Sequence, residues 1–212
     1  MKFNFLLLLL VISSSLFAQE KINFDNLSKG EKHWALWHPF AAKKAKKIIP
    51  LVRAEVRKKI EEGKIDSLIH GGQADAYRHA LWMALTAKKI GVKKARRIGQ
   101  LHEQRNKEAF YKSEVEDGSL QDSISCLMDL QNNDLGIAYG DSYKQLPDDE
   151  IAAMVLTGVL NGEFFMLFRN KKNEFMDCEG NVVSNHDRLK NKTWYLPYCL
   201  VSTSNTSEIP TR

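Results

Sequence analysis

Apolar residues recur at steps of three and four over most of the chain, which is the spacing of one face of an α-helix. In residues 39–63 this face consists of Ala42, Ala45, Ile49, Val52, Val56 and Ile60. Pro50 lies inside this segment and is expected to kink the helix or split it in two. A shorter helix is expected within residues 20–40, with Asn26 or Ser28 as its N-cap.

The same spacing predicts four more helices, over residues 73–90, 92–106, 120–138 and 148–168. Gly91 separates the first two of these, and Tyr139-Gly140-Asp141 is expected to end the third. Residues 107–119 are polar, and we expect a loop or a frayed helix end there.

The pattern changes after Arg169. Residues 175–183 surround a Glu-Gly-Asn turn, as in a β-hairpin, and residues 194–201 form a further extended segment. The predicted fold is therefore mostly α: a single helical bundle of five to six helices with a small irregular or β C-terminal tail.

The amino-acid composition is typical of a single globular protein. Of the 212 residues, 43% are hydrophobic and 27% are charged, which excludes a disordered chain and a protein with several membrane spans. We divide the chain into a signal peptide (residues 1–19), a helical domain (20–168, with its motif-bearing core at 70–168), a small β or irregular extension (169–201) and a disordered tail (202–212).

The N-terminus predicts export. Lys2 precedes an apolar run over residues 3–16, and Ala18 lies near the expected cleavage point, which is the arrangement of a secretory signal peptide. A membrane anchor is the alternative, but a bilayer span needs about 20 apolar residues, and this run is shorter and contains three serines. We expect the mature chain in the periplasm or outside the cell.

An exported chain can form disulfides. Cys178 and Cys199 lie in the C-terminal extension and are expected to pair, which leaves Cys126 inside a helix. The alternative is that all three cysteines are free.

Charge is divided along the chain. Residues 19–105 hold 20 basic and 9 acidic residues, whereas residues 106–212 hold 10 basic and 17 acidic residues. The basic N-terminal half could attract an anionic ligand or a membrane surface; alternatively, the two halves fold together and neutralise each other. We do not expect nucleic acid as a partner, since no nucleic-acid motif accompanies the charge.

The first candidate motif is Asp-Ala-Tyr-Arg-His-Ala at residues 75–80. Asp75 and His79 are four residues apart and share one helix face. A carboxylate that accepts a hydrogen bond from one imidazole nitrogen leaves the other nitrogen available as a base or ligand. A buried histidine satisfied by Asp75 alone is the structural alternative.

The second motif is His102-Glu103, with His102 on the apolar side of its helix. Two inward-facing histidines on consecutive helices can meet in a bundle, and bundles build metal sites from such side chains.

The third motif is Met-Asp-Leu-Gln-Asn-Asn at residues 128–133, in which Asp129, Asn132 and Asn133 share a polar stripe. Asp and Asn are poor helix formers, so this stripe requires a reason: metal coordination, or hydrogen bonds to a neighbouring loop. A solvated helix face is the alternative.

These three motifs, followed by Gly136, resemble a family of uncharacterised bacterial domains with the pattern Asp-Ala-x-Arg-His-Ala, His-Glu and Met-Asp-Leu-x-Asn-Asn. The resemblance covers residues 70–168 and implies no established activity. This chain has Gln131 where that family commonly has His, and if that His is a ligand the change puts activity in question.

The order His79, His102-Glu103 and Asp129 is also similar, more loosely, to that of the HD phosphohydrolases. Those enzymes are all-α and bind a divalent metal between helices. Glu103 stands where they have Asp, and its extra methylene would move a bound metal.

Two functions follow from these residues. In the first, the chain is a hydrolase of an ester or phosphoester that uses one divalent metal ion. In the second, it is a non-enzymatic exported binding or structural domain whose motifs form a buried polar network. The hydrolase assigns catalysis to His79, His102, Glu103 and Asp75, metal binding to His79, His102, Glu103 and Asp129, and substrate binding to Arg78, Asn132 and Asn133.

Overall fold

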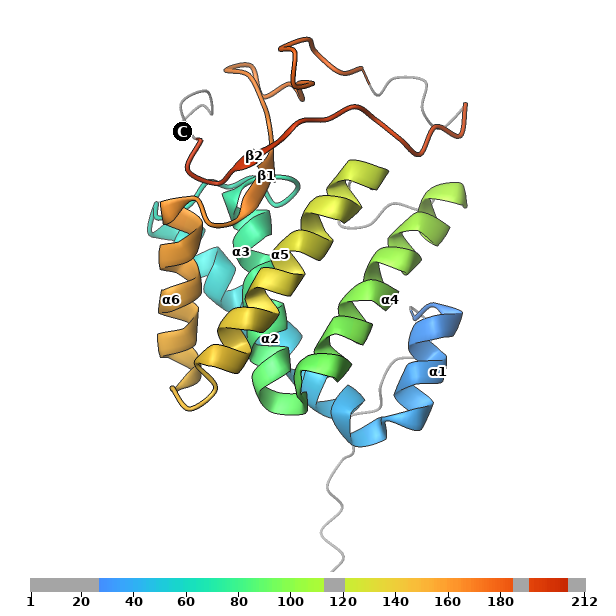
Figure 1. The fold of residues 1–212 in the computed structure, drawn as a ribbon, viewed down its shortest axis with the longest axis vertical. Coiled ribbons are helices and arrows are strands. Elements are labelled where there is room, and N and C mark those ends of the chain that lie inside the picture. The colour runs from blue at the N-terminus through green and yellow to red at the C-terminus, as the bar shows by residue number, and fades with distance from the viewer. Residues whose placement is uncertain (1–26, 113–120, 185–190, 206–212) are drawn as a thin grey trace, which may run out of the picture.

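The computed structural model describes residues 27–112, 121–184 and 191–205. Within these ranges the elements are α1 (Lys29–Trp37), α2 (Pro39–Glu61), α3 (Gln73–Ile90), α4 (Val92–Tyr111), α5 (Ser123–Ser142), α6 (Asp148–Asn161), β1 (Phe165–Leu167) and β2 (Leu200–Ser202) (Figure 1). The predicted fold class is confirmed: the chain is a mostly α bundle with a small two-stranded sheet near its C-terminus.

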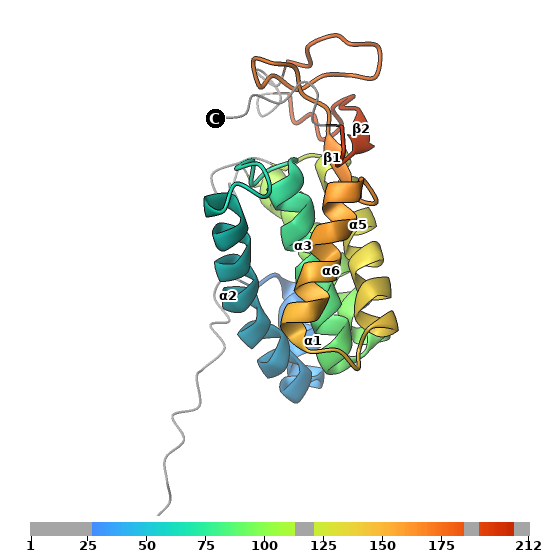
Figure 2. The same cartoon turned by 90° about the vertical axis from the view of Figure 1, so that its left-hand side faces the viewer.

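Helix α3 is the centre of the bundle. Thirteen of its 18 residues are buried, and it contacts α2, α4, α5 and α6. Figure 2 shows α2 along one side of α3, with α5 and α6 along the other side. A side chain on α3 therefore faces a neighbouring helix in nearly every direction.

Side-chain hydrogen bonds satisfy the first backbone N–H groups of α1 and α3, and Ser28 is one of the two N-caps expected for α1. Ser28 forms a capping box with Glu31 at the start of α1. At α3, the carboxylate of Asp66 accepts the backbone N–H groups of Gln73 and Ala74. These N–H groups belong to the first turn of the helix and have no partner within it.

Helix α5 approaches α3 closely because it carries Gly136 and Gly140 at the crossing. A Cβ at Gly136 would overlap the carbonyl oxygen of Ala80, and a Cβ at Gly140 would overlap that of Ala84. The prediction that Gly140 helps to end this helix is therefore wrong. The helix continues to Ser142, and the glycine serves the contact between the two helices.

Three other helix predictions need correction. Helix α2 is not split in two: it continues through Pro50, which is exposed. Helix α4 continues past residue 106 to Tyr111. Helix α6 ends at Asn161 instead of residue 168, because Gly162 adopts a left-handed conformation (φ 84°) that turns the chain toward β1.

The small sheet lies at the end of the bundle opposite α1 (Figure 1). Strand β1 pairs with β2 in antiparallel register, with Phe165 opposite Ser202. Pairing thus begins before Arg169 and includes Ser202, and Thr203 is fully buried. Ordered structure therefore extends past residue 201, into the segment predicted to be a disordered tail.

A disulfide joins Cys178 to Cys199, with 4.8 Å between the Cα atoms, and Cys126 is free and buried. This confirms the expected pairing. A bridge between Met176 and Val182 closes the predicted hairpin. A disulfide is compatible with an oxidising, extracytoplasmic compartment.

In the described ranges, no helix combines the length and the apolar character that crossing a membrane requires. The predicted signal peptide at residues 1–19 lies outside the described residues, as does the end of the chain after residue 205.

Candidate metal centre and adjoining cavity

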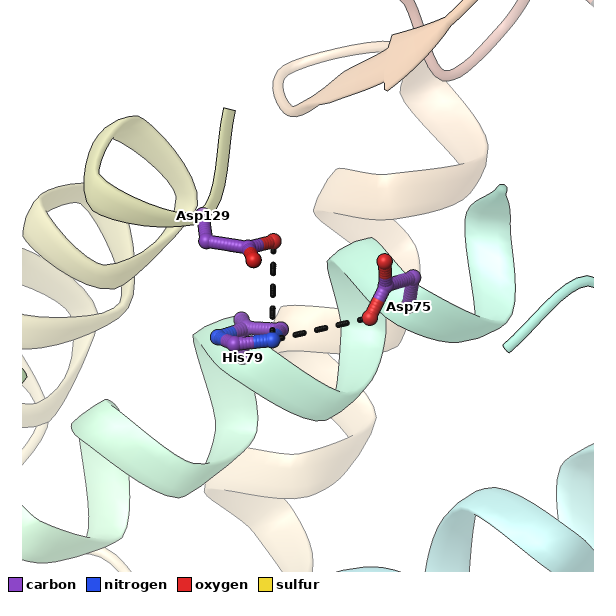
Figure 3. Close-up of side chains that lie close together, drawn as sticks. All are labelled: Asp75, His79 and Asp129. Atoms are coloured by element: carbon purple, nitrogen blue, oxygen red, sulfur yellow. Dashed lines mark ion pairs between the residues drawn. The ribbon is translucent and has the colours of Figure 1, made fainter. Parts of the chain in front are cut away.

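Three buried side chains converge between α3 and α5. Asp75 and His79 lie one turn apart on α3, and Asp129 points toward them from α5 (Figure 3). The Nε2 atom of His79 is 3.5 Å from Oδ1 of Asp75 and 3.5 Å from Oδ1 of Asp129. One potential ligand atom from each residue lies within 4.8 Å of the other two. These three residues could hold a metal ion.

The two 3.5 Å separations exceed the about 2.7–3.2 Å of an N–H···O hydrogen bond. By comparison, two ligand atoms that each lie about 2.1 Å from a tetrahedral zinc ion are about 3.4 Å apart. The imidazole nitrogen and each carboxylate oxygen thus have the spacing of atoms that share a cation.

The carboxylate of Asp75 is anchored on both of its oxygens. Its Oδ2 accepts the backbone N–H of Gly71 at 2.6 Å, and its Oδ1 accepts the guanidinium of Arg78 at 2.6 Å. The sequence-based role for Asp75 was to orient His79. The structure shows that Asp75 faces the same imidazole nitrogen as Asp129 does, so it also fits the role of a ligand.

Burial favours the neutral form of the His79 imidazole. Burial lowers the pKa of His79 well below its ordinary value of 6.5, and the positive charge of Arg78 lowers it further, although the amide of Asn133 acts in the opposite direction. Neutral imidazole is the form that binds metal ions. Burial disfavours the charged form of His79 and therefore favours the neutral form, which could bind a cation.

His102 and Glu103 lie next to the three-residue group. The ring of His102 is 6.0 Å from that of His79, measured between centroids, so the two histidines meet as predicted. Glu103 accepts a hydrogen bond from Asn106 at 3.0 Å and lies 3.9 Å from Nε2 of His102. Neither residue belongs to the set of ligand atoms formed by Asp75, His79 and Asp129.

The two asparagines of the third motif have different surroundings. Asn132 donates to the carbonyl of Phe165 and accepts its N–H, both at 2.9 Å, and so joins α5 to β1. Asn133 is buried and interacts with His79. The polar stripe thus includes both of the anticipated features, a candidate ligand and hydrogen bonds to a neighbouring segment.

A cavity of about 300 Å³ adjoins this group and is bounded by residues of α1, α2, α3 and α4. Arg78, His79 and His102 are among the residues that line it. Its wall also includes Arg53, which is exposed on α2, so the cavity connects the surface with the nearly inaccessible ring of His79. A molecule in the cavity would contact the imidazole that faces both carboxylates.

Comparison with protein families identifies the domain. The sequence model of the family described as "Domain of unknown function (DUF6973)" matches residues 32–163. The chain belongs to the DUF6973 family. A search of the curated proteins and a search of the solved structures each gave no match.

The DUF6973 match runs from within α1 to just past α6 and includes all three candidate ligands. This agrees with the expected membership of an uncharacterised domain family, and the matched region begins nearer the N-terminus than the expected residue 70. The three-motif pattern and the looser similarity to HD phosphohydrolases remain predictions. The family description names no reaction, so the function of this DUF6973 domain has to be argued from its geometry.

Sequence reasoning missed the contribution of α1 and α2 to the site. Lys46 and Arg53 lie in the basic N-terminal half of the chain, and both line the cavity. Arg105 of α4 and Trp34 of α1 line it as well. The available signal was the conjunction of basic and aromatic residues in the N-terminal half, but periodicity alone could not bring them to one cavity.

Proposed function

We propose that this DUF6973 domain is an exported, metal-dependent hydrolase that acts on an ester or phosphoester. Asp75, His79 and Asp129 hold one divalent cation in this proposal. The observation that carries it is the 3.5 Å spacing of the His79 nitrogen from two buried carboxylate oxygens, because His79 itself lines a cavity that reaches the surface.

A divalent cation at such a site supplies an activated water and polarises the bond that is to be cleaved. Hydrolysis adds the hydroxyl of that water to the acyl or phosphoryl group, and its proton leaves with the alcohol. Three protein ligands are the number that catalytic zinc sites commonly use, because a further position must remain for water.

Residues on the cavity side supply the remaining roles. Arg78 binds an anionic group of the substrate through its guanidinium. We assign the general base to His102, because it lines the cavity and its ring lies 6.0 Å from that of His79. Glu103, 3.9 Å from His102 Nε2, positions that ring.

The alternative is a non-enzymatic exported domain in which the same side chains form a buried polar network. The bond that Asn132 donates to the carbonyl of Phe165, and the bond that Asp75 accepts from the N–H of Gly71, favour it, because they tie helices to the segments beside them. Both functions require the same residues to be buried. They differ in whether a cation binds.

The deciding experiment measures metal binding by the purified chain. After incubation with Zn²⁺, Mn²⁺ or Mg²⁺ and removal of free metal, we expect about one equivalent of a divalent ion and a higher melting temperature that a chelator reverses. The Asp129→Asn variant is expected to lose at least about tenfold in metal affinity. Asp134→Asn is the matched control, since Asp134 lies on the same helix and makes an exposed ion pair with Arg96.

Less than about a tenth of an equivalent of every metal, together with a melting temperature insensitive to chelator, would contradict the proposal. In that case the polar network predicts a lower melting temperature for His79→Gln with no response to metal. Hydrolysis of a panel of nitrophenyl esters and phosphoesters, with Asp134→Asn active and Asp129→Asn inactive, tests the reaction class.

A further inference from the structure

The charged side chains of the cavity are mostly cationic and come from three helices. Lys46 and Arg53 are on α2, Arg78 is on α3 and Arg105 is on α4. Glu31 is the carboxylate in the same lining, and its Oε2 accepts the backbone N–H of Ser28 in the capping box of α1. The lining therefore has a positive net charge, although Arg78 also pairs with Asp75, which is not part of the lining.

Three of these cations affect the same side chain, His102, which also lines the cavity. The positive charges of Arg105, Arg78 and Arg53 all lower the pKa of His102, after burial has lowered it first. Arg105 also lies 3.3 Å from Nδ1 of His102. Arg53 and Arg78 line the same cavity as Arg105, so guanidinium groups from three different helices contribute to its wall. An anion beside His102 would be attracted by all three.

The remaining walls are apolar. Two tryptophans and four aliphatic side chains form much of the surface: Trp34, Trp82, Ile49, Val52, Ile98 and Leu101. An apolar surface of this kind favours a hydrocarbon, whereas a free phosphate or a sugar would leave it in contact with water. A volume of about 300 Å³ is at the small end of the range for pockets that hold small molecules, which suits one short chain.

We infer that the cavity binds a single-chain amphiphile, with its anionic head group at the arginines around His102 and its apolar chain between α1, α2 and α4. This deepens the proposed function by naming its substrate class, and only the claim that the bound molecule is hydrolysed rests on that proposal. The head group is a phosphate or a carboxylate, since either accepts the paired N–H groups of a guanidinium.

Binding is testable through the tryptophans that line the cavity. The probes are octyl phosphate and decanoate, used below their micelle concentrations and in the presence of a chelator, with tryptophan fluorescence and calorimetry as readouts. We expect one molecule per chain and an affinity at least about tenfold higher than for inorganic phosphate or decyltrimethylammonium. Inorganic phosphate has no apolar chain to contact the walls, and decyltrimethylammonium has the same positive charge as the lining. The better of the two anions identifies the head group.

Two kinds of variant locate the site. Arg53→Gln and Arg105→Gln are each expected to weaken binding by about tenfold, since each removes a charged contact to the head group. Ala45→Phe places a large side chain in the wall of the cavity and should abolish binding. Arg57→Gln, which removes an exposed cation from the same helix as Arg53 and lies outside the cavity, is expected to bind normally. Circular dichroism checks that each variant is folded.

Three results would overturn the inference: no saturable binding of either anion, equal binding of the cationic amphiphile, or binding unchanged in both Arg53→Gln and Ala45→Phe. If Ala45→Phe does not fold, the two arginine variants decide alone. The metal proposal is judged separately, because these measurements use a chelator and can be repeated on Asp129→Asn. Binding without any metal-dependent hydrolysis would support the cavity and contradict the hydrolase.

Discussion

The backbone of Gly136 on α5 rests against the backbone of Ala80 on α3, with no space for a side-chain atom between them. Ala80 directly follows His79, and Asp129 lies about two helical turns before Gly136. The absence of a side chain at Gly136 therefore sets the distance between the two helices that carry the candidate metal ligands.

Substitution of Gly136 by alanine tests this contact, because the close packing predicts that the free energy of unfolding falls rather than rises. In an exposed helix position alanine is more favourable than glycine by about 1 kcal/mol. At Gly136 we expect the opposite, a loss of about 1–3 kcal/mol in the free energy of unfolding, because α5 has to move away from α3. Urea denaturation measures the change. Ala138→Gly, at an exposed position of the same helix, is the control for intrinsic propensity. A stabilised Gly136→Ala would mean that the helices do not pack this closely.

Removal of the Cys178–Cys199 disulfide is expected to destabilise the C-terminal extension. Replacement of both cysteines by serine should lower the free energy of unfolding by about 2–4 kcal/mol, because the unfolded chain regains the freedom of the closed loop. Reducing agent should lower the stability of the wild-type chain by a similar amount and leave the double variant unchanged. Equal stability of the two proteins without reducing agent would show that the bond contributes nothing.

Loss of the Asp66 carboxylate is expected to weaken the start of α3. Its oxygens accept the N–H groups of Leu68, Gln73 and Ala74, and Asp66→Ala would leave these donors without that partner at a cost of about 1–3 kcal/mol. Thermal unfolding followed by circular dichroism measures the loss. Ser67→Ala, at the exposed neighbouring position, should leave the melting temperature nearly unchanged.

The ion pairs of Asp148 predict a dependence of stability on pH. Partial burial raises the pKa of Asp148, but hydrogen bonds from Lys88 and Lys89 outweigh this effect and lower the pKa below its ordinary value of 3.8. A lowered pKa in the folded state means that the carboxylate stabilises the fold above pH 3.8 and loses this effect as the pH falls through the lowered pKa.

Asp148→Asn should therefore be less stable than the wild type at pH 5–8, and the difference should vanish toward acid pH. Because Asp148 is more than one-third exposed, solvent screening limits the effect to about 0.5 kcal/mol. Urea titrations at several pH values, repeated at high salt, measure it. A difference that persists unchanged in acid would show that the ion pairs are not its origin.

Export is tested at the N-terminus. If residues 1–19 form a signal peptide, mass spectrometry of the secreted or periplasmic protein should find a mature chain that begins at Gln19 or Glu20. Replacement of apolar residues in the run by charged ones should leave the full-length precursor in the cytoplasm. A chain that retains Met1 in the extracytoplasmic fraction would instead indicate an uncleaved anchor.

Local patterns in the sequence were sufficient for the class of fold and for the inward-facing side chains. The period of apolar residues predicted α3 from Gln73 to Ile90 with both of its ends correct, because glycines flank it and its buried face is regular. The pairing of Cys178 with Cys199 followed from composition and position. The same reasoning failed at Gly140. A glycine that ends a helix cannot be distinguished, from the sequence alone, from a glycine that allows a neighbouring helix to pack closely.

Only the tertiary structure decided which polar residues meet. Periodicity shows that His79, His102 and Asp129 all face inward, but it contains neither the distances nor the rotations between helices. These depend on contacts such as that of Gly136 with Ala80, which bring Asp129 rather than Glu103 to the His79 nitrogen. The convergence of Arg53, Arg78 and Arg105 on one cavity has the same origin. Each arginine lies on a different helix, and helix positions are set by the packing of many side chains at once.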